Sequence, residues 1–461
     1  MEARHVSPRR FWAPRAWLGG GWAESVLLSA NEQGRWASIQ PGTVAPADAE
    51  VLAGPAIPAL VNAHSHAFQR AFVGLAERRD SASDDFWSWR DRMYGVALRI
   101  TPEQLQAVAT HLYAELLTGG YTHTCEFHYL HHAEDGKPYA DEAAMCRGLA
   151  EAARATGMGL TLLPVLYERA GFAQPALRED QRRFATDVTR VLRLRDTVRS
   201  WQLPNITAGV AVHSLRAARP ESLRQLADAL RGDPGPIHIH IAEQTAEVND
   251  CLASTGARPI EWLCRELPLD ARWQLVHATH TVPDEIAAVA ASGAGVVICP
   301  GTEANLGDGL IDLPRWLASS TPLSIGSDSQ VTRSWPEELR WLEYGQRLAL
   351  RQRNVAAAPG VQGSTAARLF DRALAGGAAA AGWPQAGLQA GARADLLVLD
   401  TQQPALCGVP DAQLLDALVF AAVERPFLRT LVAGQWAPAV PTAPAYADAM
   451  ARLWPAGPQP L

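Results

Sequence analysis

The chain is poor in lysine and has no long hydrophobic run. Of its 41 lysine and arginine residues only one, Lys137, is a lysine, a bias that genome composition explains. No apolar stretch is long enough to span a bilayer. The N-terminus, residues 1–17, is basic but lacks the apolar core of a secretory signal. These absences predict a cytoplasmic protein.

Cysteine is also scarce. None of the six cysteines has a partner at CxxC spacing, and a chain of this length does not need disulfides to be stable. We therefore expect buried, reduced thiols at Cys125, Cys146, Cys251, Cys264, Cys299 and Cys407.

Charged residues make up 19% of the chain, and the net charge is −7. A mildly acidic protein does not hold nucleic acid or an anionic membrane by bulk electrostatics. The 461 residues are 48% hydrophobic, which is enough for a large core and for more than one compact unit.

The middle of the chain alternates between short apolar runs and helix-like stretches. Runs such as AIPALVNAH, PIHIHIAE and GAGVVICP end in polar residues, and PEQLQAVATHLYAELLTGG and PESLRQLADALRG have helical character. This alternation is typical of parallel βα units. Over about 300 residues it predicts an α/β fold, a (β/α)₈ TIM-type barrel with insertions. An open doubly wound sheet is the alternative.

The two ends of the chain differ from the middle. Residues 1–56 read as short strands and turns, and GARADLLVLD and RTLVAGQW near the other end read as strands. We predict that both ends pair into one small β-sandwich domain. The expected domains are 1–56 (N-terminal part of the small β domain), 57–385 (barrel) and 386–461 (C-terminal part and tail).

Four polar groups follow strand-like runs. His64 and His66 are two apart in VNAHSHAF, a spacing that puts both imidazoles on one face of a strand. His240 ends PIHIH, and Glu243 follows it three residues later. His277 ends WQLVH, and Asp328 ends PLSIGSD.

Each group has a plain structural alternative. Histidines on a half-buried strand can bond to neighbouring groups, and an Asp at a strand end is often a helix N-cap. The combination favours a metal, because the carboxyl ends of barrel strands converge at one mouth. Three imidazoles and a carboxylate, with one position left for water, suit a catalytic zinc ion. We predict the ligands His64, His66, His240 and Asp328.

The order HxH, HxxE, a later His and then SD resembles the amidohydrolase superfamily over nearly the whole chain. More narrowly, NAHSHAFQRAF, FWSWR, EFHY, AVHSLRA, HIAEQ, LVHATH and GSDSQ resemble the formimidoylglutamate deiminases of histidine degradation. The resemblance implies hydrolysis of N-formimidoyl-L-glutamate to N-formyl-L-glutamate and ammonia.

The resemblance also implies the catalytic roles. Asp328 would accept a proton from water, His277 would orient the water or stabilise the tetrahedral intermediate, and Glu243 would move a proton to the departing nitrogen. Members with two metals commonly bridge them with a carboxylated strand lysine. Lys137 lies in the polar segment HHAEDGKPY, so we expect one Zn²⁺ per chain.

The implied substrate has an amidinium and two carboxylates. Arginine suits a carboxylate because its planar fork forms two hydrogen bonds. Arg216 in HSLR is the first candidate, and Arg90 at the end of FWSWR is chosen only because of the resemblance. Most arginines lie on protein surfaces. The remaining candidates for substrate binding are Gln69, Tyr129 and His213, of which the last two could also be satisfied core residues.

The other histidines carry no predicted chemistry. We interpret His128, His131 and His132 as part of a polar loop, because no neighbouring carboxylate or cysteine spacing completes a second metal site. His5, His111 and His123 are expected to be structural. His238 and His280 are expected to pack near the site.

Two other functions compete with the deiminase. A purine or related heterocycle deaminase of the same superfamily would share the metal chemistry, and the fifteen tryptophans could provide stacking surfaces. A non-catalytic, metal-stabilised scaffold would be expected to lose site residues, which this chain keeps.

We also predict a homodimer with FWSWR at the interface, because aromatic patches usually mark interfaces, and Arg90 could then serve the neighbour's site.

Overall fold

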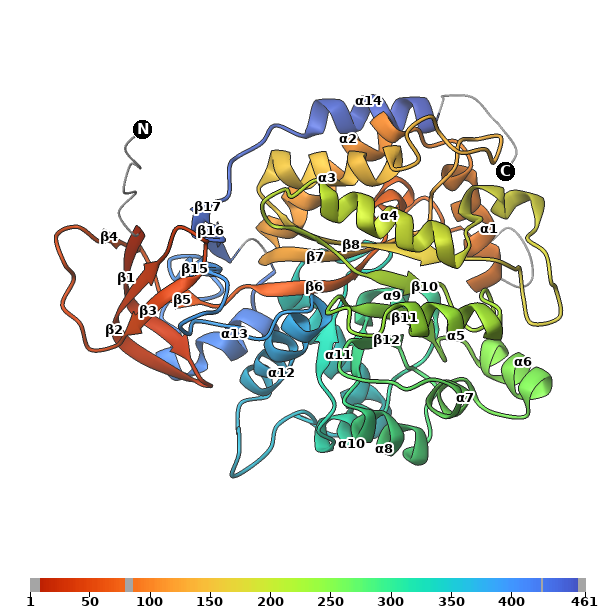
Figure 1. Ribbon diagram of the computed structural model, residues 1–461. Coiled ribbons are helices and arrows are strands. Elements are labelled where there is room, and N and C mark those ends of the chain that lie inside the picture. Colours follow the sequence, from red (N-terminus) through yellow and green to blue (C-terminus); the bar gives the residue numbers. More distant parts are fainter. Residues whose placement is uncertain (1–8, 79–85, 424–425, 455–461) are drawn as a thin grey trace.

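The computed structural model describes residues 9–78, 86–423 and 426–454, and its strands form two sheets (Figure 1). The larger sheet is parallel. Its strands follow the order of the chain: β6 (Leu60–Ser65), β7 (Tyr121–His128), β8 (Gly159–Leu166), β10 (Val210–Val212), β11 (Ile237–Ile241), β12 (Trp273–His277), β13 (Gly295–Ile298) and β14 (Leu323–Ile325). The short β9 (Ile206–Ala208) pairs with β8 outside this path.

The first and last strands of this sheet meet. Ser65 at the end of β6 forms a parallel bridge with Asp328, just after β14. The backbone N–H of His66 donates to the carbonyl of Asp328 (3.1 Å), and the N–H of Asp328 donates to the carbonyl of His64 (3.0 Å). The sheet therefore closes into the predicted barrel, and the open doubly wound alternative is wrong.

The barrel strands are buried along their whole length in β6, β7, β8, β11 and β12. Burial on both faces explains why β8 (GLTLLPVL) is an almost continuous apolar run. Strands β7 (YTHTCEFH) and β11 (IHIHI) instead carry buried polar side chains between apolar ones. The helices around them are α1 (Phe86–Ala97), α2 (Pro102–Thr118), α3 (Ala144–Thr156), α4 (Val188–Ser200), α5 (Pro220–Ala229), α6 (Thr245–Thr255), α7 (Pro259–Glu266), α8 (Pro283–Ser292), α9 (Pro300–Leu306), α10 (Leu313–Ala318), α11 (Trp335–Leu350) and α12 (Thr365–Ala380). The 3₁₀ turns η1 (Ala67–Phe72) and η2 (Glu179–Phe184) belong to the loops.

Local sequence sets the limits of the helices. Helix α2 starts at a capping box in which Thr101 and Gln104 bond to each other's backbone N–H groups, with Pro102 at the first position, and it ends at Gly119. Helix α12 lies against β14 through Gly376, where a Cβ atom would come within 2.0 Å of the Leu323 carbonyl oxygen. The segment ALAGGAAAAGW thus contains the end of helix α12, and Gly376 permits the close contact with β14.

Both ends of the chain build the smaller sheet, as predicted, on the left of Figure 1. Its order is β17 (Gln435–Trp436), β16 (Phe427–Val432), β15 (Leu396–Leu399), β5 (Ala56–Ile57), β1 (Arg9–Leu18), β2 (Gly21–Ala30) and β3 (Trp36–Gln40), with β4 (Glu50–Val51) beside β1. Strand β6 starts three residues after β5, so the barrel strands begin beside this sheet and end on the far side. The domain limits expected from the sequence remain a prediction.

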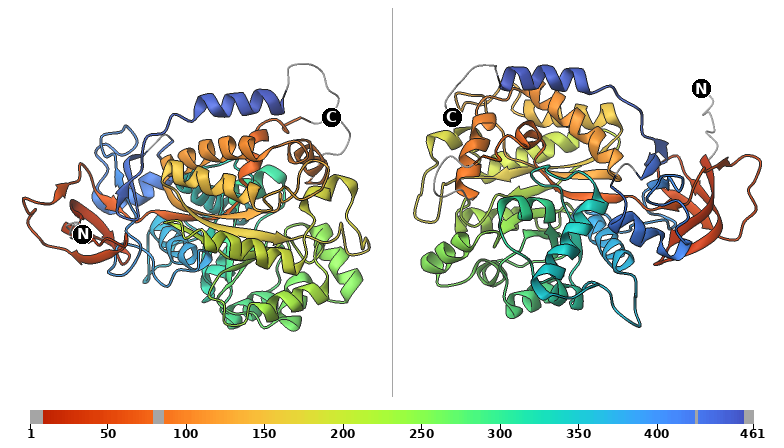
Figure 2. Two further views of the ribbon diagram at one scale, coloured as in Figure 1. Left: turned by 45° about the horizontal axis from the view of Figure 1, so that its top comes forward. Right: turned by 180° about the vertical axis from the view of Figure 1, so that it is seen from behind.

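The C-terminal part of the chain returns to the barrel. After η3 (Asp411–Gln413) and α13 (Leu414–Phe420), helix α14 (Ala443–Leu453) runs along α2 in every view (Figures 1 and 2). Tyr446 of α14 stacks on His111 of α2 at 4.2 Å between ring centroids. The hydroxyl of Tyr446 also accepts from Arg70 of η1 at 2.8 Å. The end of the chain is thereby tied to the loop that follows β6.

The cysteines are all unpaired, as predicted, but not all buried. Cys125, Cys146, Cys251 and Cys299 are buried, whereas Cys264 is half-buried and Cys407 is exposed. The expectation of burial is wrong for these last two, because Cys264 lies on the outer part of α7 and Cys407 in a surface turn before η3. In the described part of the chain, no helix is both long and apolar enough to cross a membrane.

Candidate active site

The ends of three barrel elements bring the predicted metal ligands together. The Nε2 atom of His64 lies 3.2 Å from that of His66 and 3.0 Å from that of His240. The Oδ1 atom of Asp328 lies 3.4 Å from Nε2 of both His64 and His66. All four side chains are buried.

A hydrogen bond fixes the tautomer of one histidine in this cluster, His66. His66 donates Nδ1–H to the carbonyl of Phe127 at 2.8 Å, so Nε2 of the neutral ring carries the lone pair. Burial lowers the pKa of His64 to about 3 and also lowers the pKa of His66 and His240, which keeps the rings neutral near pH 7. The Nε2 atom of His64 has two other imidazole nitrogens within hydrogen-bond distance, from His66 and His240, and it can donate a proton to only one of them. A shared cation accounts for the whole cluster, and three imidazoles with a carboxylate suit zinc.

Asp328 is fixed by the turn that closes the barrel. Its φ of +45° lies in the left-handed region, which few residues other than glycine adopt. The preceding Ser327 donates its N–H to the side chain of Asn62 on β6 at 2.8 Å. Burial works against the carboxylate, but the hydrogen bond with His64 and the nearby imidazoles hold the pKa of Asp328 well below its usual range.

Glu243 and His277 face the same point. Nε2 of His277, the last residue of β12, lies 3.7 Å from Oε1 of Glu243 and 3.8 Å from Oδ2 of Asp328. Burial and the charge of Asp328 raise the pKa of Glu243 to about 7, although His277 opposes the shift. Burial would lower the pKa of His277, but Glu243, Glu303 and Asp328 raise it to about 10. The imidazole of His277 therefore holds a proton more strongly than the carboxylate of Glu243.

A small cavity opens beside this cluster, and all five candidates for substrate binding line it. They are Gln69, Arg90, Tyr129, His213 and Arg216. The same cavity is lined by His240, Glu243, His277 and Asp328. Residues predicted from separate motifs thus share one pocket with the metal ligands.

The polar residues of the cavity are held in place by aromatic neighbours. Nε2 of Gln69 donates to the hydroxyl of Tyr129 at 3.1 Å, and Oε1 of Gln69 is buried without a hydrogen-bond partner among the described residues. His213 packs between Tyr167 and His240, with ring centroids 4.4 and 5.1 Å away. Burial, and then the charge of Arg216, keep the pKa of His213 well below its usual range, so the ring is neutral.

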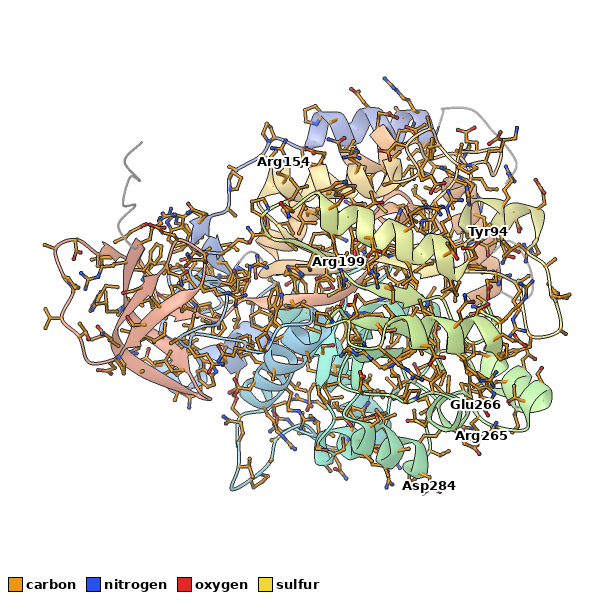
Figure 3. The ribbon with its side chains drawn as sticks, viewed as in Figure 1. Tyr94, Arg154, Arg199, Arg265, Glu266 and Asp284 are labelled. Atoms are coloured by element: carbon orange, nitrogen blue, oxygen red, sulfur yellow. The ribbon has the colours of Figure 1, made fainter. Side chains whose placement is uncertain are left out.

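Sequence reasoning missed the apolar and aromatic lining of the cavity. Trp89, Met93, Tyr94, Tyr167, Phe184 and Leu306 complete it. Tyr94 stands one helical turn after Arg90 on α1, and the Arg90 guanidinium lies 5.6 Å from the centre of its ring. The spacing of four residues between Arg90 and Tyr94 is the sequence signal that could have identified Tyr94 as a neighbour of Arg90. Figure 3 labels Tyr94 on the side of the barrel away from the small sheet, where the strands end.

The remaining histidines have structural surroundings. His238 bonds to the carbonyl of Ala380 (2.9 Å) and His280 to that of Asp308 (2.9 Å), as expected for packing residues. His111 and His123 bond to Thr442 and Thr161. His5 lies outside the described residues.

The interpretation of the cluster His128, His131 and His132 as a polar loop is only partly right. His128 ends strand β7, and all three side chains are buried. Within the described residues they do not form a group with metal-ligand spacing, whereas two other groups do: His64, His66 and His240, and beside them His277, Cys299 and Asp328. Both groups lie at the same mouth of the barrel, because Oδ1 of Asp328 lies 3.4 Å from Nε2 of both His64 and His66.

Comparison with known proteins agrees with this geometry. The model of the amidohydrolase family matches residues 56–437. The chain belongs to the amidohydrolase family. The formimidoylglutamate deiminase of Pseudomonas aeruginosa is 46% identical over 92% of this chain and 93% of its own length. The resemblance found in the sequence is thereby confirmed.

Solved structures show the same fold. The crystal structure of an amidohydrolase from Brucella melitensis has 42% identity and a TM-score of 0.90, covering 96% of this chain and 99% of that one. An adenosine deaminase from Xanthomonas campestris, solved with bound zinc, has 21% identity and a TM-score of 0.78, covering 96% and 98%. At that identity the second likeness concerns the amidohydrolase fold alone.

Proposed function

We propose that this amidohydrolase is a zinc-dependent deiminase that converts N-formimidoyl-L-glutamate and water to N-formyl-L-glutamate and ammonia. The observation that carries the proposal is a single cavity. It is lined by the predicted metal ligands His240 and Asp328, by Glu243, and by two arginines, Arg90 and Arg216. The name of the Pseudomonas aeruginosa relative supports the same substrate. In this proposal the enzyme acts in the cytoplasm, in histidine degradation.

One Zn²⁺ per chain would be held by His64, His66, His240 and Asp328. When bound, the ion would supply a Lewis acid that activates water near neutral pH. Lys137, the only lysine, is 80% exposed and pairs with Asp135 at 3.2 Å, so it does not reach the buried cluster to bridge a second ion. Metal analysis of the purified protein is the test, and two ions per chain would contradict it.

Two side chains would transfer protons, and a third would stabilise the intermediate. Asp328 accepts a proton from the attacking water, whose oxygen bonds to the amidine carbon. Glu243 pairs with the amidinium and passes a proton to the terminal nitrogen, whose bond to that carbon then breaks to release ammonia. His277 lies within 4 Å of both carboxylates and stabilises the tetrahedral intermediate.

The carboxylates of the substrate would be bound by Arg90 and Arg216, with Gln69, Tyr129 and His213 as neutral partners. Arg216 is 9% exposed, so a carboxylate beside it would be largely removed from water. Charge-assisted contacts of this kind are strong and directional. A purine has no group that requires two arginines.

Product analysis tests which bond breaks. Incubation with N-formimidoyl-L-glutamate is expected to yield one ammonia and one N-formyl-L-glutamate per turnover. Formation of glutamate and formamide would mean that the other C–N bond of the amidine is cleaved, and the proposed function would be wrong.

We also propose that the enzyme is a homodimer with FWSWR at the interface. The side chains of residues 86–88 lie outside the described residues. The ring of Trp89 packs against Phe72 of its own chain, with 5.3 Å between the centroids. Arg90 lines the cavity of its own chain, so the cavity does not need a neighbour to supply this residue.

A further inference from the structure

Glu303 is a buried carboxylate next to the site that the proposed chemistry does not use. It lies in α9, directly after β13, and is 5% exposed. Its Oε1 atom accepts the backbone N–H of Cys299 at 2.9 Å. The same oxygen lies 3.4 Å from Nδ1 of His277. One anchored oxygen therefore touches both the start of α9 and the rear of the His277 ring.

The ring of His277 has an unusual support. His277 has φ = +73° and the following Ala278 has φ = +49°, so the chain leaves β12 through two left-handed residues. A bulky residue in this region is strained and persists only where its surroundings hold it. Nε2 of the ring faces Glu243 and Asp328, and Nδ1 faces Glu303. The contact with Glu303 is the one that lies on the ring's far side.

We propose that Glu303 is a positioning residue, which holds the His277 ring by accepting Nδ1–H and so keeps Nε2 directed at the reacting group. The role of His277 in that reaction rests on the proposed function. Because Cys299 fixes the carboxylate oxygen, the hydrogen-bond acceptor is in place before substrate binds. Partners of this kind orient functional histidines in many enzymes, and their loss typically costs about 10- to 100-fold in activity.

The plain alternative is that Glu303 only satisfies the N–H of Cys299 and stabilises α9. Glu338 offers a matched control for this role. It is fully buried, and its Oε2 atom accepts the N–H of Gly301 at 2.8 Å, two residues further along the same helix start. Its other carboxylate oxygen accepts from the hydroxyl of Thr332, so both oxygens of Glu338 are engaged away from His277.

The effect of Glu303→Ala should appear in kcat. We expect kcat to fall about 10- to 100-fold, with little change in KM and an unchanged zinc content, because the variant touches neither the arginines nor the metal ligands. Glu303→Gln should keep most of the activity, since Cys299 holds its amide oxygen toward Nδ1–H. Glu338→Gln should lower the melting temperature and leave kcat unchanged.

A double-mutant cycle separates positioning from packing. In a His277→Asn background, Glu303→Ala should have almost no further effect on kcat, because the ring that it orients is gone. An equal loss in both backgrounds would overturn the proposal. So would an unchanged kcat in Glu303→Ala with a melting temperature lowered as in the Glu338 variant.

A spectroscopic readout keeps the proposal testable even if formimidoylglutamate is not the substrate. In ¹⁵N-labelled zinc-loaded enzyme, a hydrogen-bonded imidazole N–H signal should be lost in His277→Asn and also in Glu303→Ala, but retained in Glu303→Gln. Loss of the signal without any turnover by the wild type would contradict the proposed function alone. Retention of the signal in Glu303→Ala would contradict the positioning role alone.

Discussion

Replacing Arg216 tests how the cavity recognises its substrate. Arg216 lines the cavity together with Glu243 and is 9% exposed. If it binds a substrate carboxylate, Arg216→Met leaves that carboxylate unpaired in a largely dry site, which costs about 2–5 kcal/mol. Since each 1.36 kcal/mol is tenfold, kcat/KM for formimidoylglutamate should fall by a factor of roughly 30 to several thousand.

The same substitution has a second effect that the assay must separate. The positive charge of Arg216 lowers the pKa of both Glu243 and Glu247, although burial raises it for each. Removing the charge therefore favours the protonated form of Glu243. A formimidoyl amino acid that lacks one carboxylate isolates the binding effect. If the missing carboxylate is the one that Arg216 binds, Arg216→Met should be far less impaired on this analogue than on formimidoylglutamate.

The controls for Arg216→Met are a conservative variant and an exposed arginine. Arg216→Lys should rescue poorly, because an ammonium group cannot reproduce the two-bond fork. Arg224, which is 48% exposed and pairs with Glu266, should tolerate Arg224→Met without loss of activity. The reasoning is refuted if Arg216→Met hydrolyses formimidoylglutamate at the wild-type rate with normal zinc content.

Three further outcomes are expected. Glu243→Gln should keep its zinc, measured by metal analysis, and lose about 10²- to 10⁴-fold in turnover, the usual scale for an acid–base group; near-normal turnover would remove Glu243 from the mechanism. Gly376→Ala should lower the melting temperature, because its Cβ would meet the Leu323 carbonyl at 2.0 Å; an unchanged value in calorimetry would show that α12 can move away from β14. Light scattering should give the mass of a dimer, and an active monomer would contradict the assembly that we propose.

Much of the fold was predictable from local patterns in the sequence. Apolar runs in the sequence predict buried strands, and Thr101, Pro102 and Gln104 predict the start of helix α2. The metal ligands were predictable because strand ends converge in a barrel. His64 and His66 needed only their spacing of two.

Other parts of the site depend on contacts between distant segments. Glu303 reaches His277 from a neighbouring βα unit, and no spacing in the sequence indicates that contact. The left-handed turns at His277 and Asp328 could not be predicted from the sequence either, because neither residue is a glycine, the residue that usually marks such a turn. Arg90 was identified by resemblance, since one arginine among many has no local signature.

The most direct test of the account is the initial rate of ammonia release from N-formimidoyl-L-glutamate, measured beside adenosine and guanine with the same zinc-loaded enzyme. The account predicts rapid release from formimidoylglutamate and none above background from either purine compound, because the cavity pairs the metal cluster with Arg90 and Arg216. Release from adenosine or guanine, with none from formimidoylglutamate, would contradict it.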